Sequence, residues 1–488
     1  MKNEIYRFRS INNLIGEHNE LESQTIFFAS PETLNDPMEG FRDIFWQGDS
    51  IAWRNLLRHY LLCLESVCTM LLIAREDYPI LPEHIPVFLG VNDFPTPKYR
   101  ELFSNVSAKF FKSNKILTLI ETLSKRTTPI RRDELSFYLN IIHPYALETI
   151  NSTYQGNGLI PMDGHHIYNL DQLVENEVIE NIQKCLDRGD YNEDMLRALF
   201  KSFSFTNEQM SLIYEYNKDT NIKDNNKRFI LSDFVDTYIV QLEKLVYPPW
   251  YTACFMSECT NSSVWGNYGD NHTGVCLIFN TELIEKNPTI NLKGITGYSV
   301  GKNDPKPKPK PSYGFVQHLF YQIQYINGHG EIDFFRMLGR IPLTTLNSTW
   351  HTFDKNISVC SNKMTKSIDE WRKNYWDIFY RDITVKSKDW EYENELRLIL
   401  AGSFVDFTEP KNRTLNYDFM SLKGIIFGIK TKKEDKIKIM QIINAKCEAN
   451  DRNDFKFYQA FYSPTKKSID YSEMKLLSFT KKYEGKVT

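Results

Sequence analysis

The chain has 488 residues, of which 41% are hydrophobic and 14% aromatic, so it is long enough for roughly two to four domains with sizeable cores. Its net charge of −3 excludes a global positive field of the kind that attracts nucleic acid or anionic lipid. The eight cysteines include no pair spaced by two residues, which argues against a zinc ribbon or a thioredoxin-like motif. Sparse cysteine and a start without an apolar signal core (MKNEIYRFRS) predict a reduced, cytoplasmic protein.

The pattern of apolar residues predicts an α+β core interrupted by a helical insertion. We expect the first part of the core over residues 1–49, an all-helical insertion over 50–245, the remainder of the core over 246–463, and a polar tail over 464–488. The insertion is recognised by apolar residues at helical spacing, and Pro248–Pro249 marks the return to sheet. The predicted helices of the insertion are Trp53–Arg75, Tyr99–Lys125, Asp133–Tyr154, Leu170–Asp187, Asp194–Phe203, Glu208–Tyr216 and Ser232–Val246.

One stretch, Leu56–Ala74, is long and apolar enough to raise the question of a membrane span. Arg58, His59 and Glu65 interrupt it. A charge near the centre of a spanning helix costs about 2.5–3.5 kcal/mol. We therefore expect a buried helix of the insertion and no membrane association.

The second half of the chain returns mainly to strands. Trp250–Met256 and Gly274–Phe279 have the pattern of strands, and a helix is expected to begin near Asn280 or Thr281. Lys302–Pro311 has proline at every second position from Pro305, which predicts an exposed basic loop. The segments expected to complete the core are strands Phe315–Tyr325, Thr384–Leu400, Leu422–Gly428 and Phe455–Tyr462 and helices Asp333–Arg340, Thr345–Arg381 and Thr431–Ala449.

Four groups of polar and aromatic residues, in order along the chain, resemble the bacterial domain of unknown function 2971 family. They are Y-R-F-R-S at Tyr6–Ser10, S-P-x-x-x-N-D-P-x-E at Ser30–Glu39, Ser257 with the run W-x-x-Y-x-x-x-H-x-G at Trp265–Gly274, and K-x-x-x-W-x-x-E-x-E-x-R at Lys386–Arg397. The resemblance covers residues 1–45 and roughly 250–430. It implies a bacterial accessory protein, in some relatives encoded beside defence genes, but it supplies no reaction.

The last of these groups resembles, together with two earlier residues, the arginine–serine–glutamate layout of ADP-ribosyltransferases. In a strand, Glu391, Glu393, Glu395 and Arg397 would project from one face. The resemblance implies that Arg9, or Arg7 in its place, grips the phosphates of NAD, and that Ser257 braces the nicotinamide ribose. It also implies that Glu395 stabilises the positive charge that develops on the ribose and that Glu393 orients the nucleophile. The alternative is an edge strand of solvated charges.

Further residues are candidates for shaping a pocket around this chemistry. Asn35 and Asp36 stand before a proline and would either cap a structural turn or bind a ribose or an amide. Trp265, Tyr268 and His272 would either stack a nicotinamide or adenine ring or pack beneath the sheet. Lys386 and Arg397 are the cations available to the clustered carboxylates.

Three functions from different classes are therefore open. The first is a cytoplasmic effector, in phage defence or as a toxin, that cleaves NAD or transfers ADP-ribose to a protein or nucleic acid. The second is a metal-dependent nuclease that uses Asp36, Glu39, His272 and the late glutamates, although no metal-binding motif supports it. The third is a non-catalytic sensor or scaffold whose helical insertion binds a protein or a phage-derived partner. The sequence names neither the acceptor nor the oligomeric state.

Overall fold

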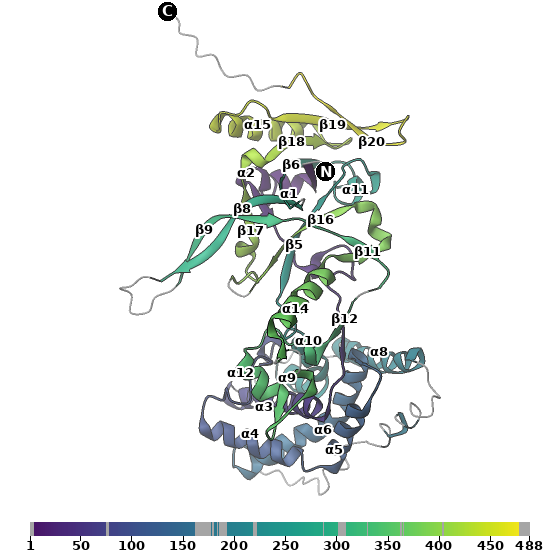
Figure 1. The fold of residues 1–488 in the computed structure, drawn as a ribbon, viewed down its shortest axis with the longest axis vertical. Coiled ribbons are helices and arrows are strands. Elements are labelled where there is room, and N and C mark those ends of the chain that lie inside the picture. The colour runs from purple at the N-terminus through teal and green to yellow at the C-terminus, as the bar shows by residue number, and fades with distance from the viewer. Residues whose placement is uncertain are drawn as a thin grey trace, which may run out of the picture. The chain divides into compact units, whose positions relative to one another are not determined.

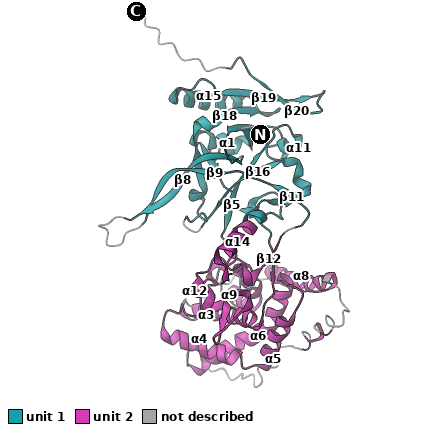
Figure 2. Cartoon of the chain, viewed as in Figure 1, with its two compact units in different colours: residues 1–41, 248–329, 380–488 teal, residues 42–247, 330–379 magenta. Residues whose placement is uncertain are grey.

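The computed structural model forms two compact units (Figure 2). Unit 1 comprises Met1–Phe41, Pro248–His329 and Tyr380–Thr488, and unit 2 comprises Arg42–Tyr247 and Gly330–Phe379. The expected insertion, 50–245, lies inside unit 2, which also includes residues 330–379 that we assigned to the core. The structure describes residues 4–477 except 75–77, 162–176, 178–179, 183, 185–192, 218–221, 286, 301–308, 329, 362–363, 365 and 403–404.

A large mixed sheet forms the centre of unit 1 (Figure 1). Among the described residues it has eight strands in the order β10-β16-β5-β1-β6-β18-β19-β20, and all neighbours are antiparallel except the parallel pair β18–β19. The strands are β10 (Tyr321–Gln322), β16 (Glu395–Ala401), β5 (Trp250–Met256), β1 (Glu4–Arg9), β6 (Val275–Asn280), β18 (Leu422–Phe427), β19 (Lys456–Ser463) and β20 (Ser468–Glu473). Distant segments of the chain thus become neighbours in one sheet.

The two faces of this sheet have different surroundings. One face packs against the short helices α1 (Ile11–Ile15) and α2 (Glu20–Ser23), the long helix α15 (Lys433–Ala449) and a second sheet, and it contains the main hydrophobic core. The other face has a smaller core around Phe8, Met256 and Trp265, partly covered by α11 (Ser262–Asn267). Because side chains alternate along a strand, each strand residue belongs to one face or the other.

The second sheet of unit 1 ends in a long hairpin. Its strands are β2 (Thr25–Phe27), β17 (Thr414–Tyr417), β8 (Asn287–Ser299) and β7 (Glu282–Ile284), with β9 (Lys310–Leu319) paired to β8. In Figure 1, β8 and β9 run out beyond the other strands of unit 1. A short parallel pair, β11 (Gln324–Ile326) with β15 (Val385–Ser387), completes the unit.

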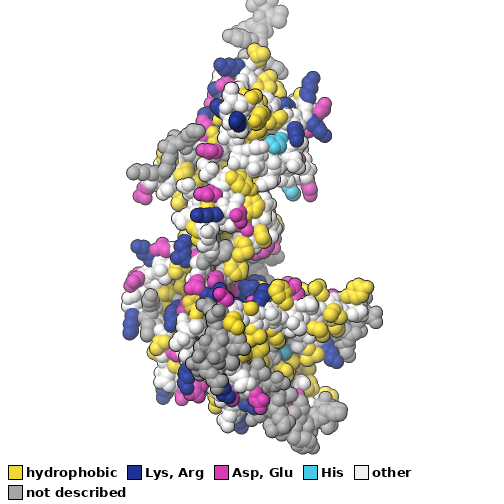
Figure 3. Space-filling model, turned by 90° about the vertical axis from the view of Figure 1, so that its right-hand side faces the viewer, with side chains coloured by type: hydrophobic (Ala, Val, Ile, Leu, Met, Phe, Trp, Pro, Cys, Tyr) yellow, Lys and Arg dark blue, Asp and Glu magenta, His cyan; other side chains and the backbone are white. Residues whose placement is uncertain are grey.

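Unit 2 is mainly helical. Its helices are α3 (Ser50–Ala74), α4 (Pro97–Phe110), α5 (Asn114–Lys125), α6 (Arg132–Gly156), α8 (Glu193–Asn217), α9 (Ile222–Arg228), α10 (Phe234–Glu243), α12 (Leu343–Leu346) and most of α14 (Ile368–Ile383). A small sheet of β12 (Glu331–Asp333), β3 (Asp43–Trp46) and β4 (Ile130–Arg131) and a hairpin of β13 (Thr352–Phe353) and β14 (Asn356–Ile357) accompany them. On the face of the protein in Figure 3, hydrophobic side chains are scattered among charged ones in both units.

Helix α3 is long and apolar enough to cross a membrane, which by itself is weak evidence for a span. It is a core helix of unit 2, with 13 buried residues that include His59 and Glu65. Glu65 accepts hydrogen bonds from Tyr99 (2.7 Å) and Tyr154 (2.9 Å), so its carboxyl group has protein partners. These contacts agree with the buried helix expected from the sequence.

Several expected elements are corrected by the structure. The residues after Asn280 form β7, which pairs with β8, instead of a helix. Asp333–Arg340 contains only a 3-10 turn, Phe334–Arg336. Part of the expected polar tail, Ser468–Glu473, joins the large sheet as β20. Most of the predicted helix Leu170–Asp187 and most of the Lys302–Pro311 loop lie outside the described residues.

Candidate functional site

The late acidic residues lie in a turn and at the start of a strand. A 3-10 turn, Lys388–Glu393, begins where the Ser387 hydroxyl accepts a hydrogen bond from the Asp389 amide. It ends at Asn394, whose φ of +46° is a conformation that asparagine tolerates better than most residues. The continuous strand expected over Thr384–Leu400 is therefore wrong, and Glu391 and Glu393 do not share a strand face with Glu395.

Three carboxylates and two cations meet at this place. We call Glu39, Lys386, Glu393, Glu395 and Arg397 the buried ion cluster. Lys386 Nζ lies 2.8 Å from Glu393, 2.9 Å from Glu39 and 3.2 Å from Glu395. The Arg397 guanidinium donates to both oxygens of Glu395, at 2.7 and 3.1 Å, and to Glu39 at 2.5 Å. Each of these five side chains is at most 2% exposed.

Neighbouring polar groups hold the buried ion cluster in place. The Tyr268 hydroxyl donates to Glu393 at 2.8 Å. The Glu395 amide donates to the Tyr325 hydroxyl at 2.8 Å, and Tyr325 itself stands opposite Lys386 in the β11–β15 pair. The ring of Trp390 lies 4.8 Å from the Lys386 ammonium. The charged groups are thus fixed by packing and by hydrogen bonds.

The surroundings shift the pKa values of the two glutamates in opposite directions. Burial alone would raise the pKa of Glu395, but Arg397 and Lys386 lower it to about 2. Burial raises the pKa of Glu393 above its ordinary value, and Lys386 and Tyr268 offset only part of that rise. The carboxylates in turn raise the pKa of Lys386, against the effect of its burial. Glu395 is therefore held as an anion, whereas Glu393 takes up a proton more readily.

Polar groups that are more accessible lie next to the buried ion cluster. Ser257 follows β5, and both its amide and its hydroxyl donate to the carbonyl of Asn394, at 3.0 and 3.1 Å. The exposed Asn267 donates to the hydroxyl of the half-buried Tyr392 at 3.1 Å. The structure thus brings Ser257 beside Glu393 and Glu395, together with Lys386, Arg397 and Tyr268.

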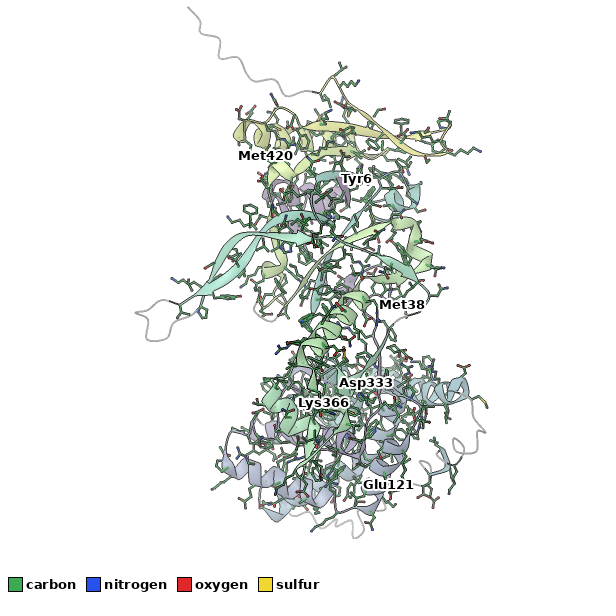
Figure 4. All side chains as sticks on the ribbon, in the orientation of Figure 1. Tyr6, Met38, Glu121, Asp333, Lys366 and Met420 are labelled. Atoms are coloured by element: carbon green, nitrogen blue, oxygen red, sulfur yellow. The ribbon has the colours of Figure 1, made fainter. Side chains whose placement is uncertain are left out.

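The two arginines of β1 lie on the opposite face of the large sheet. In the sheet register, Tyr6 and Glu395 both stand opposite Met256, so these three side chains share the face of the smaller core. Arg7 and Arg9 stand opposite Leu277 and Val275, which belong to the main core on the other face. Figure 4 labels Tyr6 on β1.

Each of these arginines has partners of its own. Arg9 pairs with Glu20 through two hydrogen bonds. Arg7 lies 5.1 Å from the Phe255 ring and donates to the Phe27 carbonyl, and burial lowers its pKa to about 10. We expected an arginine of β1 to lie beside Glu393 and Glu395, but neither Arg7 nor Arg9 does so. Side chains alternate between the two faces along β1, and both arginines lie on the face of the main core.

The loop that contains Asn35 and Asp36 forms a turn beside the buried ion cluster. The Asp36 carboxylate accepts from the Met38 amide at 2.9 Å, and the Glu39 amide donates to the Asp36 carbonyl. Asn35 is exposed, and Figure 4 labels Met38 on this loop. The turn positions Glu39, so the motif contributes its final acid to the cluster in place of Asn35 or Asp36.

Two of the aromatic candidates have structural partners. Trp265 is 1% exposed, donates to the Cys259 carbonyl at 2.8 Å and meets the edge of Phe8. His272 has a φ of +71°, and its carbonyl accepts from the Lys430 amide at 2.9 Å. Trp265 is therefore a core residue, and no stacking surface for a ring is present at its buried indole.

Two members of the site were not among the sequence candidates for NAD binding. Glu39 stands in the same motif as Asn35 and Asp36, so the spacing of that motif was the signal that could have identified it. Tyr325 gives no such signal, because its contact with Glu395 depends on the packing of β11 against β15. Cys254, opposite Arg397 in the sheet, also borders the site, and burial raises the pKa of its thiol.

The donor set fits a metal ion poorly. Within the described ranges, no group of three or more His, Cys, Asp or Glu side chains is arranged to hold one. Glu39, Glu393 and Glu395 come close together, but Lys386 and Arg397 already occupy the positions where their oxygens converge. His272 of the expected metal set interacts instead with Lys430.

Residues 264–398 match the family described as "Protein of unknown function (DUF2971)". The match confirms the resemblance to this family for the two motif groups inside it, Trp265–Gly274 and Lys386–Arg397, whereas Tyr6–Ser10, Ser30–Glu39 and Ser257 lie outside the matched segment. No curated protein and no solved structure matches the chain.

Proposed function

We propose that the buried ion cluster is the catalytic centre of an enzyme that cleaves the N-glycosidic bond of NAD. The observation that motivates this proposal is the pair Glu393 and Glu395, two residues apart, with pKa values shifted in opposite directions. Pairs of carboxylates whose surroundings separate their pKa values are typical of sites that combine acid–base work with charge stabilisation.

The proposal keeps the serine and the glutamate of the ADP-ribosyltransferase layout and leaves out its arginine, because Arg7 and Arg9 face the main core. That resemblance places an arginine, a serine and a glutamate on three separate strands. Here Arg9 lies on β1, Ser257 directly follows β5 and Glu395 begins β16, and these three strands are adjacent in the sheet. Ser257 and Glu395 come together at the end of β5 and the start of β16.

The proposed reaction uses the two glutamates differently. The bond between the ribose C1′ carbon and the nicotinamide nitrogen breaks, and neutral nicotinamide leaves with the bonding electrons. The anionic Glu395 stabilises the oxocarbenium-like ribose that remains. Water or an acceptor hydroxyl then bonds to C1′, and Glu393 takes its proton. The products with water are nicotinamide, ADP-ribose and a proton; with an acceptor, the ADP-ribose is transferred to it.

A substrate must approach through the accessible polar groups beside the cluster. Ser257, Asn267 and Tyr392 form this border. Because Glu393 and Glu395 are almost fully buried, binding requires Tyr268 or the Lys388–Glu393 turn to move aside. In this reaction Arg7 and Arg9 make no contact with NAD, because both face the main core.

The test measures nicotinamide release by chromatography after the purified full chain is incubated with NAD. Glu395→Gln should lower the rate by about 10²–10³-fold, the usual effect of losing one electrostatic stabiliser. Glu121→Gln, at an exposed acid of unit 2 (Figure 4), is the matched control and should leave the rate unchanged. Circular dichroism must show that both variants are folded. No release by the unaltered chain, or full activity of Glu395→Gln, contradicts the proposal.

A second substitution tests whether an arginine of β1 contacts the substrate. Arg9→Lys keeps the positive charge beside Glu20, so a folded variant should retain the rate of nicotinamide release. A large loss of activity in a folded Arg9→Lys chain would mean that a β1 arginine contacts substrate after all.

The complete burial and internal pairing of the cluster favour a second candidate, a non-catalytic role. In that case the cluster only fastens the loop of Glu39 to β16, and unit 2 binds a partner protein. Glu395→Gln would then lower the stability of unit 1 while the unaltered chain shows no turnover of NAD. The stability and activity measurements on the same variants separate the two functions.

A further inference from the structure

The β8–β9 hairpin has an exposed aromatic surface on one face. Pro311, Tyr313 and Phe315 alternate along β9 and therefore point to the same side. Tyr298 stands opposite Pro311 and Lys293 opposite Phe315, which places both on that side. Tyr298, Tyr313 and Phe315 are 45%, 62% and 57% exposed.

The other face of the hairpin differs in character. Opposed residues there include the pairs Gly294–Gly314 and Gly297–Ser312, which have little or no side chain. Near the base of the hairpin this face approaches β17, where a Cβ at Gly294 would lie 2.6 Å from Leu415. Leu415 belongs to the main hydrophobic core, so the small residues lie on the sheet face that turns to this core, and the aromatic rings lie on the opposite face. Three large rings exposed on one ribbon are typical of a binding surface.

We propose that this aromatic face of the hairpin binds single-stranded nucleic acid. Side chains two apart on a strand are about 6.6–6.8 Å apart. Two rings that enclose a base must be separated by about twice the 3.4 Å stacking distance, or about 6.8 Å. This separation equals the spacing of the two side chains along the strand. A base therefore fits between the rings of Tyr313 and Phe315, and Tyr298 offers a further ring toward the tip.

The charge of the hairpin complements a polyanion. Lys293 lies on the aromatic face, and Lys310 stands at the outer end of β9. Neither β8 nor β9 contains an acidic residue. Exposed aromatic rings beside lysines are the combination by which proteins bind single strands without sequence preference, because every base has a face that can stack.

The experiment measures the fluorescence anisotropy of labelled 20-nucleotide oligo(dT) and oligo(U) with the full chain, without NAD. Both oligonucleotides should bind, and each should be displaced by the other. Replacing Tyr298, Tyr313 and Phe315 by alanine together should weaken binding by at least a hundredfold, since each stacked base contributes about fivefold or more. Tyr462→Ala, at an exposed tyrosine of β19, is the matched control and should change nothing.

The salt dependence separates the two kinds of contact. Lys293→Ala should make the slope of log affinity against log salt shallower by about 0.7, the contribution of one phosphate contact to a single strand. The aromatic replacements should leave that slope unchanged. The absence of binding to either oligonucleotide, unchanged binding in the triple variant, or equal binding of a duplex would overturn the proposal. The first of these outcomes would indicate a protein partner for the rings. None of these measurements depends on the proposed activity toward NAD.

Discussion

A buried polar network of unit 1 and one of unit 2 are of opposite kinds. In unit 1, the buried ion cluster places three carboxylates around Lys386 and Arg397. In unit 2, one buried network consists of imidazoles paired with tyrosines: His59 with Tyr238 at 2.9 Å and His143 with Tyr60. Both networks are almost inaccessible to water, yet one is charged and the other neutral.

The imidazoles of unit 2 have a defined protonation. The second nitrogen of His59, Nε2, lies 2.9 Å from the Val87 carbonyl, which can only accept, so Nε2 bears the proton. Nδ1 then accepts from the Tyr238 hydroxyl. His143 repeats the arrangement between Tyr60 and the Ile230 carbonyl. Burial lowers the pKa of both histidines to about 4.

The difference shows what counter-charges do in a protein interior. Burial without an opposite charge favours the neutral form, as it does for His59 and His143. Burial with an opposite charge in contact keeps Glu395 ionised, and its pKa falls to about 2. A neutral network can fasten helices together, but only the charged network holds a fixed anion next to a glutamate that can accept a proton.

The largest expected effect comes from breaking the charge balance of unit 1. Arg397→Met leaves Glu395 and Glu39 buried without one of their two cations. We expect it to lower the free energy of unfolding of unit 1 by about 3–5 kcal/mol. Lys466→Met, at an exposed pair with Asp470, should change it by about 0.5 kcal/mol or less. Urea unfolding monitored by hydrogen exchange measures both changes. Equal stability of the two variants would contradict the conclusion that the buried ion cluster is ionised.

Acid should destabilise the two units in different pH ranges. His59 and His143 have folded pKa values near 4, below their ordinary 6.5, so their neutral forms stabilise unit 2 above pH 6.5. That contribution is lost as the pH falls from 6.5 toward 4 and amounts to about 3 kcal/mol for each histidine.

Glu395 behaves in the same direction but at lower pH. Its folded pKa of about 2 lies below the ordinary 4.5, so its contribution to unit 1 is present above pH 4.5 and is lost toward pH 2. Hydrogen exchange followed by mass spectrometry from pH 7 to 3 should therefore show protection lost first in α3 and α6 and later in β16. The reverse order would refute the assignment of charge to the two networks.

A smaller effect is expected from removing one hydroxyl of the neutral network. Tyr238→Phe leaves Nδ1 of His59 buried with only the weak thiol donor of Cys63, 3.9 Å away, which should cost about 1–3 kcal/mol of unfolding free energy. His59 should also protonate at a different pH, which NMR titration of its ring would detect. Tyr216→Phe, at a tyrosine that is 90% exposed, is the control and should have no measurable effect.

The smallest effect belongs to the hydroxyl at the border of the charged network. Tyr268→Phe removes one hydrogen bond to Glu393 and should cost about 1 kcal/mol. Because that hydrogen bond lowers the pKa of Glu393, the variant should raise this pKa further. An infrared carboxyl band that appears at higher pH in Tyr268→Phe than in the unaltered chain would verify the shift; an unchanged band would count against the contact.

Much of the helical and strand content followed from the sequence pattern, and the exceptions have physical causes. Strand β5 and helix α15 end within two residues of the expected bounds. The break between β15 and β16 was missed because Ser387 and Asn394 interrupt a run whose composition otherwise suits a strand. Asp194–Phe203 and Glu208–Tyr216 form one helix, α8, since no residue between them stops it.

The sequence by itself determined the resemblance of residues 264–398 to the family of unknown function 2971, the polar motifs and the residue types that the site would need. Only the tertiary structure decided which of them meet. The period of two along a strand turned Arg7 and Arg9 toward the main core and Glu395 and Arg397 toward the smaller one. The turn after Asp36 brought Glu39 to Lys386, a contact across more than three hundred residues that local pattern does not encode, because it depends on packing between distant strands.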